Sequence, residues 1–350
     1  MIISVSRRTD IPAFYAPWFE RRLRDGFALV RNPRNPAHVR RISLIPSDVD
    51  CFVFWTKDAR PLFGLLDRLD EAGYPYYFQW TVTPYGRDME PGIAPKEEIL
   101  SAFRTLAERI GPSRVIWRYD PVIVSEEYPE EQHREEFARM CRFLQGSTEQ
   151  CVLSFVDIYR KNRGRGFREA PPEIMHGLVR SFAESAAGKG IFLRTCCEAE
   201  DFTREGAPRG ACIDKSLAER LAGRPLEVAK DKNQRPLCGC CESTDIGAYD
   251  TCTAGCIYCY AVRDLRTAEA NRARHDPGSP FLVPQKRGPE GPQMLRIPGS
   301  DFRAYSPRVT RSIPVRRAFL FISSSSGLLP SFSSMASSIS CSDKAPLSLI

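Results

Sequence analysis

The sequence predicts an α/β fold whose parallel sheet forms a full or partial (β/α) barrel. From the N-terminus to about residue 200, short apolar runs alternate with amphipathic stretches of helical periodicity. Such alternation is typical of βαβ units and therefore of a mostly parallel sheet. Six clear apolar runs, a seventh candidate and a length of 350 residues favour a barrel over a two-layer sandwich. A doubly wound open sheet stays the alternative, because periodicity does not show whether a sheet closes.

Each predicted strand is a short apolar run that ends at polar or turn residues. The expected strands are residues 2–5, 51–55, 76–82, 114–117, 151–156 and 191–195, with 28–31 as the seventh candidate. Between and after them, apolar residues recur at helical spacing. The expected helices are residues 14–24, 62–69, 95–110, 130–144, 172–187 and 215–222. Gly26 and Gly73 end the first two helices, and Pro95 lies in the first turn of the third.

Changes in composition divide the chain into three parts. Residues 1–235 are the expected barrel body, and residues 236–285 form a cysteine-cluster segment packed on it. Residues 286–350 differ from both, since ten serines fall between Ser323 and Ser340 with no charged residue among them. That low-complexity composition predicts a disordered C-terminal tail, to which we assign no function.

Charge and hydropathy narrow the classes of function. The formal charge is +7, but nine Lys or Arg against three Asp or Glu place a net +6 in residues 286–350. The nearly neutral remainder is weak evidence for binding to a nucleic-acid backbone. The chain has no apolar run of membrane-spanning length and no signal-peptide core, so we expect a cytoplasmic protein without a membrane partner. Cysteines stay reduced in the cytoplasm, where a dense cluster favours metal binding over disulfides.

Polar residues follow several of the predicted strands. Asp10 lies beyond the first strand, Lys57 follows the strand at 51–55, and Arg118 and Asp120 follow the strand at 114–117. Active sites of barrels collect at the carboxyl ends of the strands, so these four residues are candidate catalytic groups. Each of them is equally explained by a strand that turns polar as it leaves the core.

Six of the thirteen cysteines fall between positions 238 and 259. The last three follow the spacing Cys252-x3-Cys256-x2-Cys259, and three thiolates on a cubane iron–sulfur cluster leave one iron open. A zinc ion is the competing candidate for this site, because four of the six cysteines could form a tetrathiolate site. The x3/x2 spacing is unusual for zinc and favours iron–sulfur ligation. The other three, Cys238, Cys240 and Cys241, are candidate ligands of a second metal centre.

The cysteine loop resembles that of radical S-adenosylmethionine enzymes, including Tyr258 just before the last cysteine. A larger part of the chain, roughly residues 1–280, resembles the DUF1848 family of uncharacterised bacterial proteins. The matching segments are residues 4–13, 53–57, 117–121, 154–157 and 245–261. That family has no established activity, and its relation to the radical enzymes rests on the C-terminal cysteines.

The resemblance to the radical enzymes implies a permuted order of elements. Their cluster loop follows the first barrel strand, whereas here it follows the last. A strand just before Cys252 would then occupy the first position, and the strand at 2–5 the second. In the radical enzymes a Gly-Gly-Glu segment after the second strand holds the methionine amino group. This chain has no Gly-Gly-Glu, and Arg7, Arg8 and Thr9 would occupy that place as cofactor-binding residues together with Tyr258.

The resemblance therefore implies a [4Fe–4S] protein that binds S-adenosylmethionine and receives an electron from a donor. It would form a 5′-deoxyadenosyl radical that acts on a small-molecule or unknown substrate. Two alternatives stay open. The first is a non-catalytic zinc or iron–sulfur module. The second is a radical enzyme that modifies nucleic acid, with aromatic residues such as Trp55, Trp80, Tyr85 and Trp117 stacking on bases.

Overall fold

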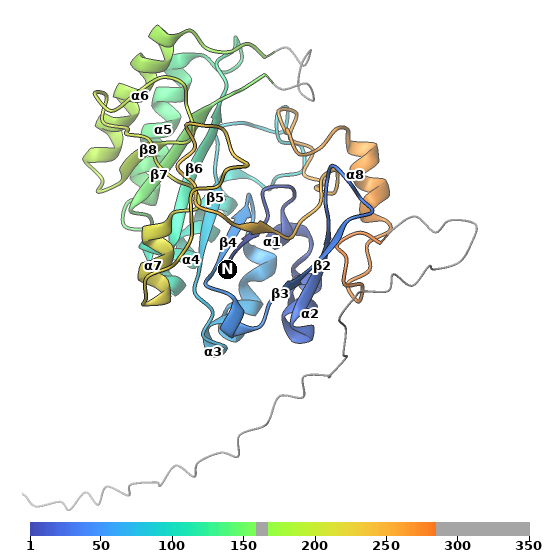
Figure 1. Ribbon diagram of the computed structural model, residues 1–350. Coiled ribbons are helices and arrows are strands. Elements are labelled where there is room, and N and C mark those ends of the chain that lie inside the picture. The colour runs from blue at the N-terminus through green and yellow to red at the C-terminus, as the bar shows by residue number, and fades with distance from the viewer. Residues whose placement is uncertain (159–166, 285–350) are drawn as a thin grey trace, which may run out of the picture. The chain divides into compact units, whose positions relative to one another are not determined.

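The computed structural model describes residues 1–158 and 167–284 (Figure 1). The predicted disordered tail, 286–350, lies outside these residues. Among the helices of the described chain, none is both long enough and apolar enough to cross a membrane.

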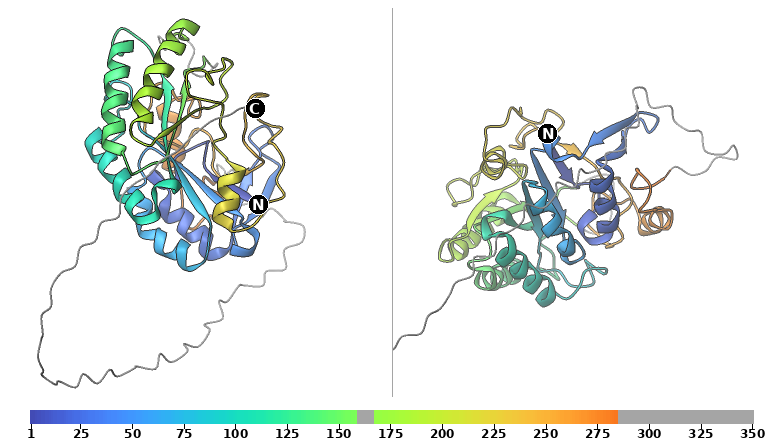
Figure 2. Two further views of the ribbon diagram at one scale, coloured as in Figure 1. Left: turned by 90° about the vertical axis from the view of Figure 1, so that its left-hand side faces the viewer. Right: turned by 90° about the horizontal axis from the view of Figure 1, so that it is seen from below.

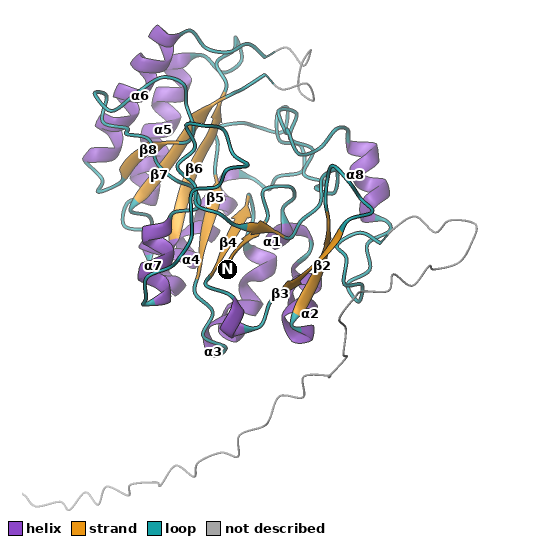
Figure 3. Ribbon diagram, in the orientation of Figure 1, coloured by secondary structure: helices purple, strands orange, loops and turns teal. Residues whose placement is uncertain are grey.

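A seven-stranded parallel sheet forms the centre of the fold (Figure 3). Its order is β8–β7–β6–β5–β4–β1–β9. The strands are β1 (Ile2–Val5), β4 (Cys51–Thr56), β5 (Tyr76–Thr81), β6 (Val115–Val122), β7 (Gln150–Phe155), β8 (Phe192–Thr195) and β9 (Thr244–Asp245). All six strands that the apolar runs predicted are present, and the α/β class and the parallel sheet are confirmed.

The strand order follows the chain order from β1 to β8, and β9 then returns to pair with the outer edge of β1. An order without reversal differs from a doubly wound sheet, in which the strand order reverses at a switch point. Within the described residues, β8 and β9 are the two edges of the sheet and do not pair with each other. A closed barrel is therefore not shown.

The seventh strand is not the one that the sequence predicted. Residues 28–31 do form a strand, β2 (Phe27–Arg31), but it pairs antiparallel with β3 (Val39–Ser43) in a separate two-stranded sheet. The expectation that this segment joins the main sheet is wrong. The short connection 32–38 instead makes β2 and β3 an antiparallel hairpin. The seventh place belongs to β9, a strand of two residues that has no apolar run.

Most helices lie where the periodicity placed them. The predicted helix at 14–24 is divided at Tyr15 into α1 (Ile11–Phe14) and α2 (Ala16–Asp25), where Pro12 and Pro17 each stand in a first turn. The others are α3 (Leu66–Glu71), α4 (Lys96–Ile110), α5 (Glu130–Leu144), α6 (Pro172–Ala187), α7 (Lys215–Ala222) and α8 (Leu265–Arg272). The last of these was not predicted.

The two faces of the sheet have different covers (Figure 2). Phe54, Trp80 and Trp117 point to one face and belong to the main core, to which helices α2 to α6 contribute. Val53 and Tyr77 alternate with them and point to the other face, where they pack with residues of α7 and with a group of buried cysteines. Helices α2 to α6 cover one face, and α7 with a cysteine-rich segment covers the other.

Candidate functional site

Asp245, the last residue of β9, connects the two ends of the folded chain. Its carboxylate accepts hydrogen bonds from the Ser4 hydroxyl at 2.9 Å, the Ser6 hydroxyl at 2.6 Å and the Arg7 backbone N–H at 2.8 Å. The Gly247 N–H donates a further bond at 2.9 Å. Charge-assisted bonds of this kind are among the stronger ones in proteins, so Asp245 fixes the segment before the cysteine loop to the end of β1.

Gly247 has a steric reason to be glycine. A Cβ at this position would lie 2.1 Å from Ser6 Oγ and 3.0 Å from Thr9 Cγ2. No real Cβ atom tolerates the first of these approaches, so the close passage of the chain beside Ser6 requires a residue without a side chain.

The loop after β9 carries Cys252, Cys256 and Cys259, and these three residues line a pocket of about 350 Å³ beside the start of α8. The thiol of Cys252 interacts electrostatically with the thiols of the other two. Burial raises the pKa of Cys256 to about 12, although the nearby Lys57 ammonium lowers it. A bound cation or cluster would reverse this balance, because metal coordination favours the thiolate.

A second loop, residues 86–93, holds the cysteine loop in place. The Gly92 N–H donates to the Ala254 carbonyl at 2.9 Å, and the Ile257 N–H donates to the Met89 carbonyl at 3.0 Å. A Cβ on Gly92 would lie 2.7 Å from the Ala254 oxygen, so the two backbones are in close contact. Any side chain on loop 86–93 that points inward therefore lies beside the three cysteines.

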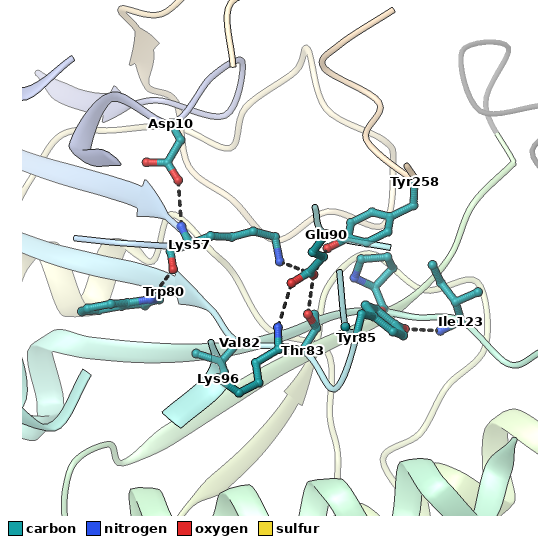
Figure 4. A network of polar contacts seen from close by, with 12 residues as sticks. Asp10, Lys57, Trp80, Val82, Thr83, Tyr85, Glu90, Lys96, Ile123 and Tyr258 are labelled. Atoms are coloured by element: carbon teal, nitrogen blue, oxygen red, sulfur yellow. Dashed lines mark hydrogen bonds and ion pairs between the residues drawn. The ribbon is translucent and has the colours of Figure 1, made fainter. Parts of the chain in front are cut away.

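Glu90 is that side chain (Figure 4). Its carboxylate is 2% exposed and accepts hydrogen bonds from the ammonium groups of Lys57 and Lys96, each at 2.8 Å. The hydroxyls of Thr83 and Tyr258 also donate to it. Burial alone would raise the pKa of Glu90, but the two ammonium groups lower it to about 2. Glu90 is thus an ionised centre that binds the cysteine loop, through Tyr258, to the end of the sheet.

The predicted catalytic residues Asp10 and Lys57 are neighbours. Asp10 caps α1 by accepting the Ala13 N–H at 3.0 Å, and it accepts the Lys57 backbone N–H at 2.8 Å (Figure 4). Burial raises the pKa of Asp10 to about 6, against these two hydrogen bonds. The Lys57 ammonium lies 5.6 Å from the centre of the Tyr258 ring. Burial alone would lower the pKa of Lys57, but the charges of Glu90 and Cys256 raise it.

The other predicted pair, Arg118 and Asp120, extends the same polar region. Arg118 donates to the Asp120 carboxylate, which also accepts the Ser154 hydroxyl. Both residues lie within β6, which continues to Val122, so the prediction that they follow this strand is wrong. Asp120 is nevertheless within electrostatic range of Lys57, which follows β4. The other terminal nitrogen of the Arg118 guanidinium, Nη1, donates to the sulfur of Cys212 at 2.8 Å.

The predicted cofactor-binding residues 7–9 follow β1 directly. The Arg7 guanidinium lies 5.8 Å from the Trp55 ring centre, and the Arg7 carbonyl accepts the Tyr260 hydroxyl at 2.8 Å. Arg8 lies 3.9 Å from the Asp245 carboxylate. Thr9 is 6% exposed, and within the described part of the chain its hydroxyl has no hydrogen-bond partner. A buried hydroxyl in this state is available to a ligand.

The predicted second set, Cys238, Cys240 and Cys241, is buried and separate from the loop of Cys252, packing instead on the face of the sheet that α7 covers. Among the described residues, no group of three or more His, Cys, Asp or Glu side chains is arranged so that it could hold a metal ion.

The aromatic residues considered for base stacking are mostly core. Trp80 and Trp117 are 0% exposed and Tyr85 is 1% exposed, so none of these three is accessible to a base. Only Trp55 is partly exposed, and the guanidinium groups of Arg7 and Arg118 both lie over its ring.

Sequence reasoning missed Glu90 and Asp245 as site residues. Asp245 was inside a segment that resembled the DUF1848 family, so the signal was present but no role was assigned to it. Glu90 stands in a loop with no apolar periodicity around it, and nothing in its local sequence marks it as buried. Only the meeting of loop 86–93 with the cysteine loop reveals its position.

Comparison with known proteins gives one match. The family model described as a domain of unknown function, DUF1848, matches residues 2–261, which include all seven strands and the three cysteines of the loop after β9. No curated protein and no solved structure matches the chain at a significant level. The match spans well over half of the sequence, and the chain therefore belongs to the DUF1848 family.

Proposed function

We propose that this chain is an iron–sulfur protein that resembles radical S-adenosylmethionine enzymes, with Cys252, Cys256 and Cys259 as the protein ligands of a [4Fe–4S] cluster. The observation that carries the proposal is the place of the cysteine loop. It follows β9, and β9 pairs in parallel with β1 through Ile3–Thr244 and Ser4–Asp245. The loop thereby stands next to the first strand of the chain, as the permuted order requires.

The local chemistry fits such a cluster. The three cysteines supply soft sulfur ligands around one pocket of about 350 Å³. The Lys57 ammonium, fixed by Glu90, offsets the negative charge that three thiolates introduce. Such a cluster, with one iron free of protein ligands, would supply the electron that cleaves S-adenosylmethionine reductively.

The residues of the chain would bind and orient the rest of the cofactor and the substrate. The Thr9 hydroxyl, which has no hydrogen-bond partner among the described residues, and the Arg8 guanidinium follow β1, where the permuted order expects the methionine part to bind. Arg118 and Asp120 form an ion pair within β6, beside which a polar substrate could bind. Tyr258, held by Glu90, keeps the cysteine loop seated beside them.

We further propose that the sheet is a partial (β/α) barrel. One feature supports this, namely a strand order that follows the chain from β1 to β8. A doubly wound sheet instead reverses its strand order at a switch point.

The test is anaerobic purification and reconstitution of the full chain, followed by counting of iron and sulfide. We expect about four irons per chain, and loss of most of that iron in Cys256→Ser. The matched control is Cys141→Ser, a buried cysteine of α5 that belongs to the main core. With a strong reductant, the wild type should convert S-adenosylmethionine to 5′-deoxyadenosine and methionine.

Two results would contradict the proposal. Iron that is absent, or that survives in Cys256→Ser, would remove the cluster from this loop. Iron that is present while S-adenosylmethionine stays intact under reductant would contradict the catalytic part and leave a non-catalytic iron–sulfur module.

A further inference from the structure

A second group of cysteines packs against the face of the sheet that α7 covers. Cys196 follows β8, Cys212 lies before α7, and Cys238 and Cys240 precede β9. The sulfur of Cys212 lies 3.1 Å from that of Cys196. The Cys212 thiol also interacts with that of Cys240, which in turn interacts with that of Cys238. Four thiols from three separate segments therefore contact one another in sequence.

The backbone around these thiols is closely fixed. A Cβ on Gly239 would lie 2.9 Å from the Gly210 carbonyl oxygen, so the Cys238–Cys240 segment packs directly against the segment of Cys212. The Cys212 carbonyl accepts the Tyr77 hydroxyl and the Gln79 amide, each at 2.8 Å. Both donors belong to β5, so the central sheet orients Cys212.

Hydrogen-bond donors point at the sulfur atoms. The Arg118 guanidinium donates to the Cys212 sulfur at 2.8 Å, and the Ile213 N–H donates to the Cys240 sulfur at 3.3 Å. Arg7 also lies within electrostatic range of Cys240 and Cys212. Donors and positive charge around sulfur stabilise thiolates, and an apolar core of neutral thiols has no need of either.

We propose that Cys196, Cys212, Cys238 and Cys240 bind one zinc ion in a tetrahedral site, distinct from the cluster proposed at Cys252. A zinc–sulfur bond of about 2.3 Å places neighbouring sulfurs roughly 3.8 Å apart, and the sulfurs of Cys196 and Cys212 lie 3.1 Å apart. A cubane cluster binds its cysteines through separate irons and needs its sulfurs farther apart.

Binding requires a small rearrangement. The four sulfurs contact one another in a chain and do not surround one point, so rotation about χ1 must bring them together around the ion. Four thiols then release four protons, and the tetrathiolate site carries a net charge of −2. The guanidinium groups of Arg7 and Arg118 offset that charge.

Cys241 does not belong to this set. Its sulfur donates to the Ile213 carbonyl at 3.4 Å, and its backbone pairs with Lys230. Four protein ligands leave no open position on zinc, so the site is structural. It would join the end of β8 to the segments before α7 and β9, which cover the second face of the sheet.

The test uses the full chain purified without oxygen from medium containing zinc and iron. We expect about one zinc per chain, with X-ray absorption showing four sulfurs at about 2.3 Å. Cys212→Ser and Cys240→Ser should lose the zinc and keep the iron, and Cys256→Ser should show the reverse. Cys151→Ser, at a buried position of β7 in the main core, is the control that should keep both metals.

The opposite results would overturn the proposal. These are a wild type without zinc, zinc that survives in both Cys212→Ser and Cys240→Ser, or iron lost together with zinc in those variants. A disulfide between Cys196 and Cys212 in the unreduced wild type would likewise assign the thiols to redox chemistry. If the serine variants do not fold, the sulfur count around zinc in the wild type decides the question.

Discussion

The Ser6 hydroxyl donates a 2.6 Å hydrogen bond to the Asp245 carboxylate across 239 positions of sequence. With the bonds from Ser4, Arg7 and Gly247, it fixes the strand before the cysteine loop to the first strand of the chain.

Replacement of Asp245 by alanine should destabilise the fold. It removes an ionised acceptor and leaves several partly buried donors without a partner, which costs about 2–3 kcal/mol. Urea unfolding of Asp245→Ala against wild type measures this loss. The control is Asp201→Ala, an exposed residue whose carboxylate bonds Thr203 and lies 4.0 Å from the Arg209 guanidinium, and for which we expect less than about 0.5 kcal/mol.

Gly247→Ala should separate β9 from β1. The new Cβ would lie 2.1 Å from Ser6 Oγ, so one of the two segments must move. We expect a lower melting temperature and, under the proposed function, a loss of bound iron. Gly64→Ala is the matched control, since a Cβ there meets no atom within 4 Å. Equal behaviour of the two variants would show that the close approach has no structural importance.

Glu90→Gln should be strongly destabilising. Glutamine keeps the shape but removes the charge that pairs with Lys57 and Lys96, and breaking a buried ion pair on one side costs about 3–5 kcal/mol. Glu98→Gln at an exposed ion pair with Arg60 is the control and should cost less than about 1 kcal/mol. Chemical denaturation of both variants provides the comparison, and a loss at Glu90 no greater than at Glu98 would contradict the role assigned to Glu90.

His133 should make the protein less stable in mild acid. The ring is fully buried, with Nδ1 at 2.9 Å from the Tyr119 hydroxyl and Nε2 at 2.9 Å from the Ile123 carbonyl. Burial lowers the pKa of His133 below its usual 6.5, although the bond to Ile123 raises it. The unfolded chain therefore takes up the proton first, and stability is lost as the pH falls below about 6.5.

The free energy of unfolding should fall by up to about 1.4 kcal/mol per pH unit in that range from this group. In His133→Gln that contribution disappears, so the difference from wild type should narrow between pH 7 and pH 5. His38→Gln, at an exposed position, should follow the wild-type pH dependence. A constant difference between His133→Gln and wild type would contradict the assignment.

A chain that ends at Ala261, where the family match ends, should be less stable than one that ends at Pro284. The segment between them donates and accepts bonds with the N-terminal elements. The Leu29 N–H bonds the Pro280 carbonyl at 2.9 Å, and the Trp18 indole bonds the Ser279 carbonyl at 2.9 Å. Melting temperatures of the two truncated chains test this, and equal values would mean that residues 262–284 contribute nothing to the fold.

The regular part of the fold was predictable because it repeats a simple pattern. Each strand from β4 to β8 is a buried run, and each helix from α4 to α7 has one apolar face. The division at Tyr15 and the hairpin β2–β3 escaped prediction because they depend on turn geometry. β9 escaped for another reason, since its two residues are held by the partner strand and by Asp245 rather than by apolar burial.

The candidate site shows the same limit. Cysteine spacing identified Cys252, Cys256 and Cys259 as one group, and the structure places them around one pocket. Spacing could not connect Cys196 with Cys212, or either with Cys240, because these residues meet only through folding of separate segments. The burial of Glu90 could not be predicted from the sequence either, because it depends on a contact between two loops and not on the neighbouring residues.

The pairing of β9 with β1 also determines the order in which the site can form during synthesis. β1 leaves the ribosome first, and its outer edge has no partner until Asp245 emerges, after all other strands of the sheet. A contact between such distant parts of the chain forms slowly. The pocket at Cys252 therefore cannot form until all seven strands have been synthesised, and a metal bound there would enter only after that point.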